Sequence, residues 1–396
     1  PVNGDVTYTA QYTKALDPVH FSQDGDTYTI HDAAGWDIFC DLLAENPKGY
    51  FDGKTVMLGD DIAVTRMAGG AGHDMTGTFD GQGHTLTVSY GSADAPVNDD
   101  DKAAPFRNVE SGCVIKNLHT AGTIYPAKKY AGGIVGTQYG TVRIENCRSS
   151  VTINSLTSGD GTHGGIVGRI GNSTSAELTI TGCLFDGKLL TVGNEETTSC
   201  SGFVGYKFNQ TTLTITNSIY APAALEPGET EAANNSATFV RNGSAGSNCY
   251  YTRALGATEN QGKQAYTVTA GENVTPALSG TATEYTVSGI KAYADNCGLK
   301  YGDKIYAGNE DELDLTLGYT RPAGYAFTGY TVSAGTLAGN VLTMPAEDVT
   351  INAEFEQATY TITVAPTTHG TVLSIKSAAV YGEYVALIVM PESGYY

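Results

Sequence analysis

Few residues in this sequence have types and spacing suited to chemistry, and the segment FDGQGH, Phe79–His84, is the first of them. Asp80 and His84 in this segment are an acid and a base of the kind that act together on glycosidic bonds. An Asp-Gly step followed by Gly-His between two strand-like segments is, however, far more typical of a turn. We therefore interpret FDGQGH as a turn and predict no catalytic residue.

The segment VNDDDK holds three consecutive carboxylates, Asp99, Asp100 and Asp101, and is the candidate for a metal site. Hard oxygen ligands of this kind suit Ca²⁺, but calcium loops place their ligands at alternating positions, and this run does not. A solvated acidic loop is the better interpretation. His163 stands alone before a GGIVG segment, and we interpret it as a satisfied surface or corner histidine.

Motifs for other chemistries are missing from the sequence. Neither HExxH nor GxSxG occurs, and the Gly-rich segments follow no phosphate-loop pattern. The seven cysteines are too widely spaced for a CxxC zinc site or a disulfide scaffold. The sequence therefore predicts no cofactor, no resident metal and no enzyme.

Tyrosine gives the one positive indication of binding. More than half of the 25 tyrosines lie beyond residue 255. A tyrosine ring has a flat apolar face and a polar rim, which suits sugar or protein surfaces. Because tyrosine is also favoured in strands, we interpret most of these residues as structural.

The elements that would position such residues are short strands in a repeat. The segments Gly132–Gly136 and Gly164–Gly168 both read GGIVG, and Ser201–Gly205 reads SGFVG. Short β-like phrases that accompany them share a column made of Asn117, Asn146, Gly182, Asn217 and Asn248. The next column consists of Leu118, Cys147, Cys183, Ser218 and Cys249.

A period of 29 to 36 residues with several short strands per unit predicts a solenoid of stacked β-coils. Stacking would place each asparagine above the next, so the amides are expected to form a hydrogen-bonded ladder. Cys147 and Cys183 are expected beside it as small, inward, apolar residues. The paired glycines fit a corner that needs a positive φ or a close approach of backbones.

One convincing helix precedes the repeats, in HDAAGWDIFCDLLAENPKG. Its apolar residues Trp36, Phe39 and Leu43 recur at helical spacing, Asp32 is placed to cap its start, and Asn46-Pro47 ends it. The open end of a solenoid exposes unpaired backbone and core, which must be covered. We therefore expect this helix to be a cap.

The composition excludes several classes of protein. With 22 Lys plus Arg against 42 Asp plus Glu, the formal charge of -20 disfavours nucleic acid and anionic polysaccharide as partners. A hydrophobic content of 41% is enough for packed cores, and no apolar run approaches the ~18 residues of a membrane span. We expect a monomer with no membrane insertion.

The two ends of the chain repeat internal segments. GDVTYTAQYT at Gly4–Thr13 matches EDVTINAEFE at Glu347–Glu356, and Glu383–Tyr395 is similar to Glu312–Tyr325. We interpret the chain as a piece of a longer tandem array.

Two family resemblances follow from these motifs. The helix, the strand GKTVMLGDDI, the phrase FDGQGHTLTV and the GGIVG segments with their Asn-Cys step resemble the GLUG-motif regions of secreted bacterial proteins, from about Tyr28 to Ala254. The segments GEYVALIVMPESGY and TMPAEDVTINAEF resemble the InlB-like B repeats of surface proteins of Gram-positive bacteria. Tyr266–Ile290 departs from a normal repeat of that kind.

The resemblances imply an all-β fold, namely a right-handed parallel β-helix with one N-terminal capping helix, plus C-terminal small β-domains. We expect the last strand of a preceding β-repeat in residues 1–19, the β-helix in 20–258, a β-repeat or sandwich-like domain in 259–356, and a truncated InlB-like repeat in 357–396.

The two resemblances imply a non-catalytic, extracellular segment of a bacterial surface protein, secreted or attached to the cell wall, that acts as an adhesin-type module and binds a host or environmental glycan or protein. Binding is expected in the loops Gly91–Lys102, Leu156–His163 and Val192–Cys200, whose lengths vary most between repeats. One alternative is a β-helix lyase or glycosidase, which requires two carboxylates within about 10 Å on one face. A second alternative is a spacer without a ligand.

Overall fold

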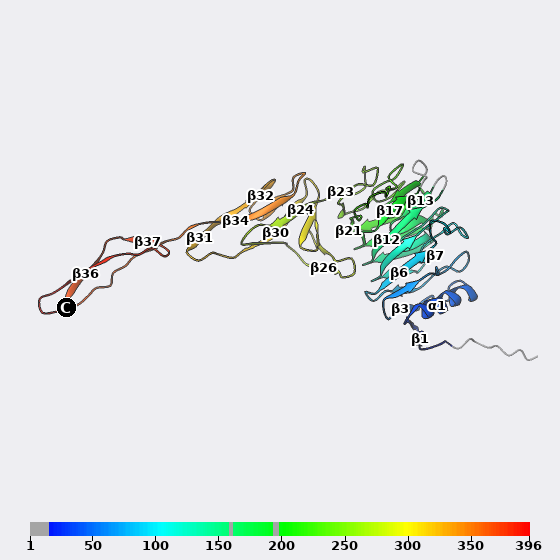
Figure 1. Cartoon of the computed structure of the whole chain (residues 1–396), viewed down its shortest axis with the longest axis horizontal. Coiled ribbons are helices and arrows are strands. Elements are labelled where there is room, and N and C mark those ends of the chain that lie inside the picture. The colour runs from blue at the N-terminus through cyan, green and yellow to red at the C-terminus, as the bar shows by residue number, and fades with distance from the viewer. Residues whose placement is uncertain (1–15, 158–160, 193–197) are drawn as a thin grey trace, which may run out of the picture. The chain divides into compact units, whose positions relative to one another are not determined.

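The computed structural model describes residues 16–157, 161–192 and 198–396. These residues are almost all β-structure with a single α-helix, which confirms the all-β prediction. The chain divides into two compact units, one of Pro1–Ala265 with Ala282–Ala292 and one of Tyr266–Thr281 with Tyr293–Tyr396 (Figure 1). The strand expected in residues 1–19 lies almost wholly outside the described residues. The continuous part of the first unit ends at Ala265, and Lys263–Gln264 adds its last strand.

Three sheets form most of the first unit, and successive passes of the chain add a strand to each in turn. The smallest has the order β19-β14-β10-β7 and consists of β7 (Phe106–Val109), β10 (Val135–Gln138), β14 (Val167–Ile170) and β19 (Val204–Tyr206). All of its pairs are parallel, and its register aligns Phe106, Val135, Val167 and Val204. The GGIVG and SGFVG segments therefore stack on one another, with Phe106 in the same column.

The second sheet has eight strands in the order β1-β2-β3-β5-β8-β11-β15-β20. They are β1 (Phe21–Asp24), β2 (Thr27–Ile30), β3 (Thr55–Leu58), β5 (Thr78–Asp80), β8 (Val114–Lys116), β11 (Thr141–Glu145), β15 (Glu177–Thr181) and β20 (Thr212–Thr216). Only the β1–β2 pair is antiparallel within this sheet.

The third sheet has the order β23-β22-β21-β16-β12-β9-β6-β4, with β17 beside β12. Its strands are β4 (Ile62–Val64), β6 (Thr85–Tyr90), β9 (His119–Ile124), β12 (Arg148–Ser155), β16 (Leu184–Phe185), β17 (Lys188–Thr191), β21 (Ser218–Tyr220), β22 (Cys249–Tyr251) and β23 (Lys263–Gln264). A further parallel pair is formed by β13 (Gly161–Gly164) and β18 (Thr198–Ser201).

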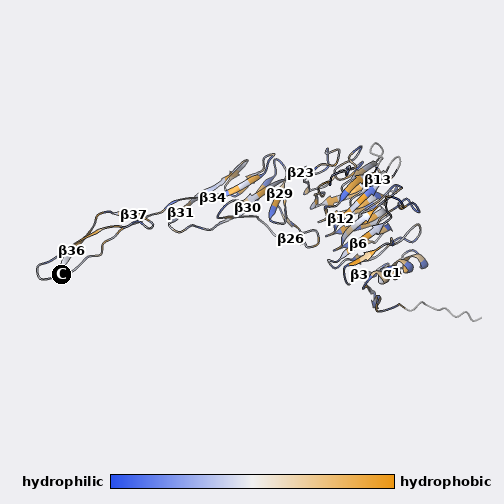
Figure 2. Cartoon of the chain, in the orientation of Figure 1, coloured by the Kyte–Doolittle hydropathy of each residue, from blue (hydrophilic) through white to orange (hydrophobic). Residues whose placement is uncertain are grey.

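The helix α1 (Ala33–Glu45) lies at the β1–β2 end of the first unit (Figure 1). The Asp32 side chain accepts a hydrogen bond from Gly35 N and caps the helix, as the sequence predicts. Trp36 and Phe39 are fully buried, and both pack against Phe79 and Phe106 at ring distances of 5.8–6.5 Å. The helix thus closes the apolar core at this end. Figure 2 shows hydrophobic residues along the strands of both units.

The asparagine column occupies one corner of the stack. Asn117, Asn146, Asn217 and Asn248 all have φ between +50° and +52°, in the left-handed region that asparagine tolerates better than most residues. Asn146 Nδ2 donates to Asn117 Oδ1 at 2.7 Å, and Asn248 Nδ2 donates to Asn217 Oδ1 at 3.2 Å. Asn117 Nδ2 donates to Asp80 Oδ1 at 2.9 Å, so a carboxylate begins the ladder.

The ladder is interrupted at Gly182, where residues Ala282–Ala292 of the same unit cover the corner. A Cβ atom on Gly182 would overlap the Tyr285 ring. Tyr285 OH lies 3.4 Å from Asn217 Nδ2, and Val287 N donates to Asn146 Oδ1 at 2.9 Å. The covering segment thus contacts the asparagine on either side of the gap, and the gap accommodates its aromatic ring.

The cysteine column runs inside the asparagine column. Cys147, Cys183 and Cys249 are buried, and each thiol lies 3.2–3.5 Å from the carbonyl two residues earlier. Ser218 occupies the same column, and its hydroxyl donates to Thr216 O at 2.8 Å. All seven cysteines are free, and burial raises the pKa of Cys249 to about 12. The buried thiols of this column are therefore packing groups.

The paired glycines serve close approach of backbones. A Cβ atom on Gly133 would overlap Gly165 O, and one on Gly165 would overlap Gly202 O. Neither residue has a positive φ. Of the two reasons the sequence suggests for these glycines, crowding between stacked coils is the one that applies, and the left-handed corner belongs to the asparagines.

The second unit has two main sheets. One includes β24 (Tyr266–Ala270), β28 (Leu299–Tyr301), β29 (Lys304–Ala307), β31 (Tyr325–Val332) and β34 (Val349–Gln357); the other consists of β25 (Val274–Leu278), β30 (Glu312–Tyr319), β32 (Thr336–Ala338) and β33 (Val341–Thr343). Their core contains Val268, Ile305, Leu313, Leu342 and Ile351. Two antiparallel pairs follow, β35 (Thr359–Thr361) with β37 (Ala378–Val380) and β36 (Gly370–Ser374) with β38 (Leu387–Pro391). The segment that covers Gly182 contains the short strand β26 (Ala282–Tyr285) and most of β27 (Ile290–Tyr293).

Gly182→Asn tests why the ladder is interrupted. The new side chain would complete the asparagine column but collide with Tyr285, so we expect a loss of about 1–3 kcal/mol in stability, as for overpacking. Hydrogen exchange at Val287 N should become faster because Tyr285 is displaced together with its neighbours. Chemical unfolding and hydrogen exchange measure the two effects.

The matched control is Gly112→Asn, at another positive-φ glycine with open space around its Cβ position. This variant should leave Val287 exchange unchanged. Equal effects of the two variants on Val287 exchange would show that the Tyr285 contact does not determine the residue at position 182.

Candidate functional site

A polar column crosses the sheet β7-β10-β14-β19 two residues after the column of Phe106, Val135, Val167 and Val204. The register aligns Asn108 with Thr137, Thr137 with Arg169, and Arg169 with Tyr206. We call these four residues the polar column. Asn108 and Thr137 are buried, whereas Arg169 and Tyr206 are partly exposed. The sheet therefore brings four side chains from four passes of the chain into one line that reaches the surface.

Aromatic rings flank the exposed part of the polar column. The Arg169 guanidinium lies 4.1 Å from the centroid of the Tyr130 ring, and its Nη2 donates to Tyr139 OH at 3.4 Å. Arg241 lies over the Tyr206 ring at 5.5 Å, and Phe208 packs edge-on against Tyr206 at 5.0 Å. Cation–π contacts of this kind hold planar groups in fixed orientations. The result is a preformed surface of rings and hydrogen-bonding groups.

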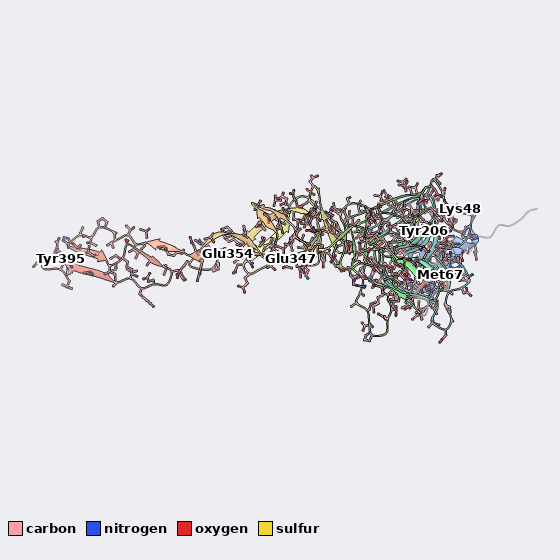
Figure 3. All side chains as sticks on the ribbon, turned by 90° about the horizontal axis from the view of Figure 1, so that it is seen from above. Lys48, Met67, Tyr206, Glu347, Glu354 and Tyr395 are labelled. Carbon is pink, nitrogen blue, oxygen red and sulfur yellow. The ribbon has the colours of Figure 1, made fainter. Side chains whose placement is uncertain are left out.

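A pocket of about 340 Å³ lies at the Asn108 end of the polar column. We call it the Asp74 pocket, and its lining consists of Lys48, Ala71, Gly72, Asp74, Lys102, Asn108, Glu110 and Tyr139. Figure 3 labels Lys48, which lines this pocket, and Tyr206, which is the last residue of the polar column. The main chain of Asp74–Thr76 runs beside β7, since Met75 forms a parallel bridge to Val109. Asp74 and Asn108 are therefore neighbours in adjacent passes of the chain.

Charges in the Asp74 pocket are paired. Lys48 Nζ lies 2.8 Å from Glu110 Oε2 and 3.7 Å from Asp74 Oδ2, and Lys102 Nζ lies 3.1 Å from Asp100 Oδ1. Burial raises the pKa of Asp74, and the nearby Glu110 charge adds to this effect, while Asn108 and Lys48 oppose it. The hydrogen bond to Glu110 raises the pKa of Lys48. Lys48 is thus a stable cation that bridges two carboxylates.

Two oxygens at this pocket have no hydrogen-bond partner within the described part of the chain. They are Asp74 Oδ1 and Asn108 Oδ1, and their side chains are only 7% and 3% exposed. A buried acceptor without a donor costs about 1–3 kcal/mol, so each such group calls for an explanation, such as a partner from outside the chain. Here two of them meet at one pocket, which can accept hydrogen bonds from a ligand.

Asp80 and His84 do not act as a pair. Asp80 Oδ1 accepts from Gln82 N at 3.0 Å as well as from Asn117, and Asp80 Oδ2 lies 3.3 Å from Lys116 Nζ. His84 Nδ1 instead lies 3.4 Å from Asp61 Oδ1. Gln82 has a φ of +53° inside the loop between β5 and β6. These contacts are those of a turn that begins the asparagine ladder.

The three consecutive aspartates do not converge on one point. Asp99 Oδ2 pairs with Arg107 Nη2 at 2.5 Å, and Asp100 pairs with Lys102. The residues that the structure describes contain no group of three His, Cys, Asp or Glu side chains arranged to hold a metal ion. Two of the three calcium candidates are thus engaged by cations.

The interpretation of His163 as a satisfied histidine is confirmed, but its placement at the surface is wrong. His163 is fully buried in β13, where it pairs with Cys200 of β18. Its Nδ1 accepts from Ala131 N at 3.1 Å, so the neutral ring carries its proton on Nε2, which lies 2.8 Å from Ser155 Oγ. The extra β13–β18 pair, which the sequence pattern does not indicate, provides this burial.

Sequence reasoning missed Asp74, Asn108 and Glu110. A weak signal was present, because Asp74-Met75-Thr76 and Asn108-Val109-Glu110 are polar-apolar-polar triplets that fall side by side in the structure. Of the loops expected to bind, Leu156–His163 and Val192–Cys200 lie partly outside the described residues. Gly91–Lys102 contributes Lys102 to the Asp74 pocket.

Comparison with known proteins identifies one family. Residues 301–359 and 360–396 match the model of a divergent InlB B-repeat domain, which agrees with the resemblance seen in the sequence. Repeats of this type occur in bacterial surface proteins, and the match points to no enzyme family. No curated protein and no solved structure gives a significant match. Among the described residues, no helix is long and apolar enough to cross a membrane.

Asp74→Asn tests the electrostatics of the pocket. Because the pKa of Asp74 is raised in the folded state, its contribution to stability is fully present below the unfolded-state pKa of about 3.8. That contribution is lost as the pH rises through the raised value. We therefore expect the Tm of the variant, relative to the parent chain, to increase between pH 3 and pH 7 in thermal unfolding.

The exposed Asp24→Asn is the control, and its Tm difference from the parent should change less over this pH range. A Tm difference for Asp74→Asn that falls as the pH rises would contradict the assigned electrostatics.

Proposed function

We propose that this chain is a non-catalytic segment of a secreted or wall-attached bacterial surface protein, and that it displays a rigid binding module for a glycan or protein. The observation that carries the proposal is the divergent InlB B-repeat match over residues 301–396, in the same chain as a stack of parallel strands. The proposal identifies the first unit as a right-handed parallel β-helix with GLUG-like motifs. The ordered succession of strands among three sheets supports this identification.

Rigidity suits the first unit to recognition. The asparagine ladder, the close glycine contacts and the α1 cap hold each pass of the chain in register with the next. A surface that is already ordered loses little conformational entropy when it binds, so more of the contact energy appears as affinity. The polar column with its flanking rings is the part of this surface best suited to sugars, because aromatic faces and planar polar groups occur together there.

The alternative function is a glycosidase or lyase, which requires a pair of carboxylates. Asp74 and Glu110 form such a pair. Both carboxylates contact Lys48, at 3.7 and 2.8 Å, so their oxygens are separated by no more than the sum of these distances. Glycosidases place their carboxyl groups about 5–9.5 Å apart, with the scissile oxygen or a water between them. Here the Lys48 ammonium bridges the two groups and takes that place. This arrangement supports binding without turnover.

Glycan binding by the full 396-residue chain tests the proposal. On an array of neutral and sialylated glycans, and on immobilised mucin, we expect saturable binding that favours neutral structures because the chain carries a charge of -20. Tyr206→Ala removes a ring and the contact of Arg241 with it, and should weaken binding about tenfold, as for a moderate hot spot.

Tyr384→Ala is the matched control, since Tyr384 is 99% exposed in the second unit. It should bind as the parent chain does. A chain that binds none of these surfaces and no host protein would instead favour a spacer without a ligand.

A further inference from the structure

We propose that the Asp74 pocket binds the terminal sugar of a neutral glycan by accepting hydrogen bonds from its hydroxyl groups. This inference rests on the proposed binding function and names the class of ligand and the residues that recognise it. Asp74, Asn108 and Tyr139 are the residues assigned to direct contact. The partly exposed residues of the polar column, Arg169 and Tyr206, with their flanking rings then provide contacts for the rest of the glycan.

The first argument is the unmet hydrogen-bonding capacity of the pocket. Asp74 Oδ1 and Asn108 Oδ1 are acceptors without donors in the described chain, and both side chains are more than nine-tenths buried. A ligand that satisfies them must present two donors close together. Neighbouring hydroxyl groups on a sugar ring have this geometry, and each hydroxyl also accepts a bond from a group such as the Lys48 ammonium.

The second argument is charge. The pocket lining contains two lysines and two carboxylates, and Lys102 is in addition paired with Asp100. No excess of cations is present to attract a carboxylate or sulfate, and the chain as a whole repels anions. A divalent cation would require Lys48 to leave the position between Asp74 and Glu110. A neutral ligand needs no excess of cations in the pocket and leaves Lys48 in place, so it is the class that fits.

The third argument is shape. A volume of about 340 Å³ is at the lower end of the range for small-molecule sites, so it suits one or two sugar rings rather than a chain buried end to end. Tyr139 supplies a ring to the lining, and the hydrogen bond from Arg169 holds that ring in place. Apolar sugar faces pack on such rings. Gly72 and Ala71 leave the remaining wall open.

The experiment uses the full chain and the methyl glycosides of glucose, galactose, mannose and N-acetylglucosamine. Saturation-transfer NMR should detect at least one of these probes at millimolar concentration, with the strongest transfer to the ring protons beside the bound hydroxyls. Asp74→Asn and Asn108→Leu should each reduce the affinity at least tenfold. In Asp74→Asn the amide oxygen is favoured on the Lys48 side, so an NH2 donor replaces the Oδ1 acceptor. Asn108→Leu removes the amide while keeping a side chain of similar size.

Asp24→Asn and Tyr384→Ala should leave the glycoside affinity unchanged. Thermal unfolding of every variant establishes that it is folded, and Asp74→Asn separates loss of binding from loss of fold because its Tm at pH 7 is expected to be maintained. Calcium chloride alone is titrated in parallel.

The outcomes separate this inference from the proposed function. Glycoside binding that is lost in both pocket variants supports it. Mucin or array binding that survives in Asp74→Asn and Asn108→Leu, with no glycoside contact in the parent chain, overturns the pocket and leaves the binding function standing. If calcium shifts the NMR signals of the chain and no glycoside binds, the ligand of the pocket would be a cation and not a sugar. Absence of binding to every glycan probe overturns the pocket, and absence of binding to host protein as well overturns both proposals.

Discussion

Vertical register is the constraint on which the first unit depends. Each strand of the three sheets pairs with its counterpart one pass of the chain later, so a residue's neighbours are set by its position within the pass. A shift of one residue would turn every side chain to the opposite face of its sheet. The asparagine column resists such a shift, because each member needs both a left-handed backbone and an amide at the level of the next amide. The glycine contacts add a steric restriction, since only a residue without Cβ fits beneath the carbonyl of the following coil.

The one interruption in the asparagine column shows how the two requirements can be separated. Gly182 keeps the left-handed conformation, with a φ of +62°, but gives up the amide. The space that results holds the Tyr285 ring, and the asparagines on both sides bond to residues 285–287 of the covering segment. The asparagine column therefore forms the corner of each coil and also binds the covering segment. The adjacent column is less demanding, because Cys and Ser both reach the carbonyl two residues earlier.

Properties that repeat along the chain could be predicted, and those that occur once could not. The asparagine and cysteine columns were visible because equivalent residues recur with the period of the coils, and the capping helix was visible because its apolar spacing is local. The Asp74 pocket draws on Lys48, Lys102 and β7, segments with no shared pattern, and it exists only because register places Met75 beside Val109. His163 was misplaced for a related reason. Its burial depends on the β13–β18 pair, which forms beside only some of the coils.

The acidic composition bears on selectivity at the Asp74 pocket. A chain with a charge of -20 attracts cations over its whole surface, so charge alone gives no selectivity for a cationic ligand, and it repels anions. Within the pocket the lysines balance the carboxylates, and the local field is small. Discrimination then has to come from hydrogen-bond geometry, where a site with buried acceptors rejects ligands that lack donors far more strongly than it rejects small changes in size. Asp74 Oδ1 and Asn108 Oδ1 are acceptors of this kind, and they are held by adjacent passes of the stack whose spacing is fixed by the sheet. The same register that stabilises the fold therefore fixes the distance between Asp74 and Asn108, the two residues that would bind the hydroxyl groups of the ligand.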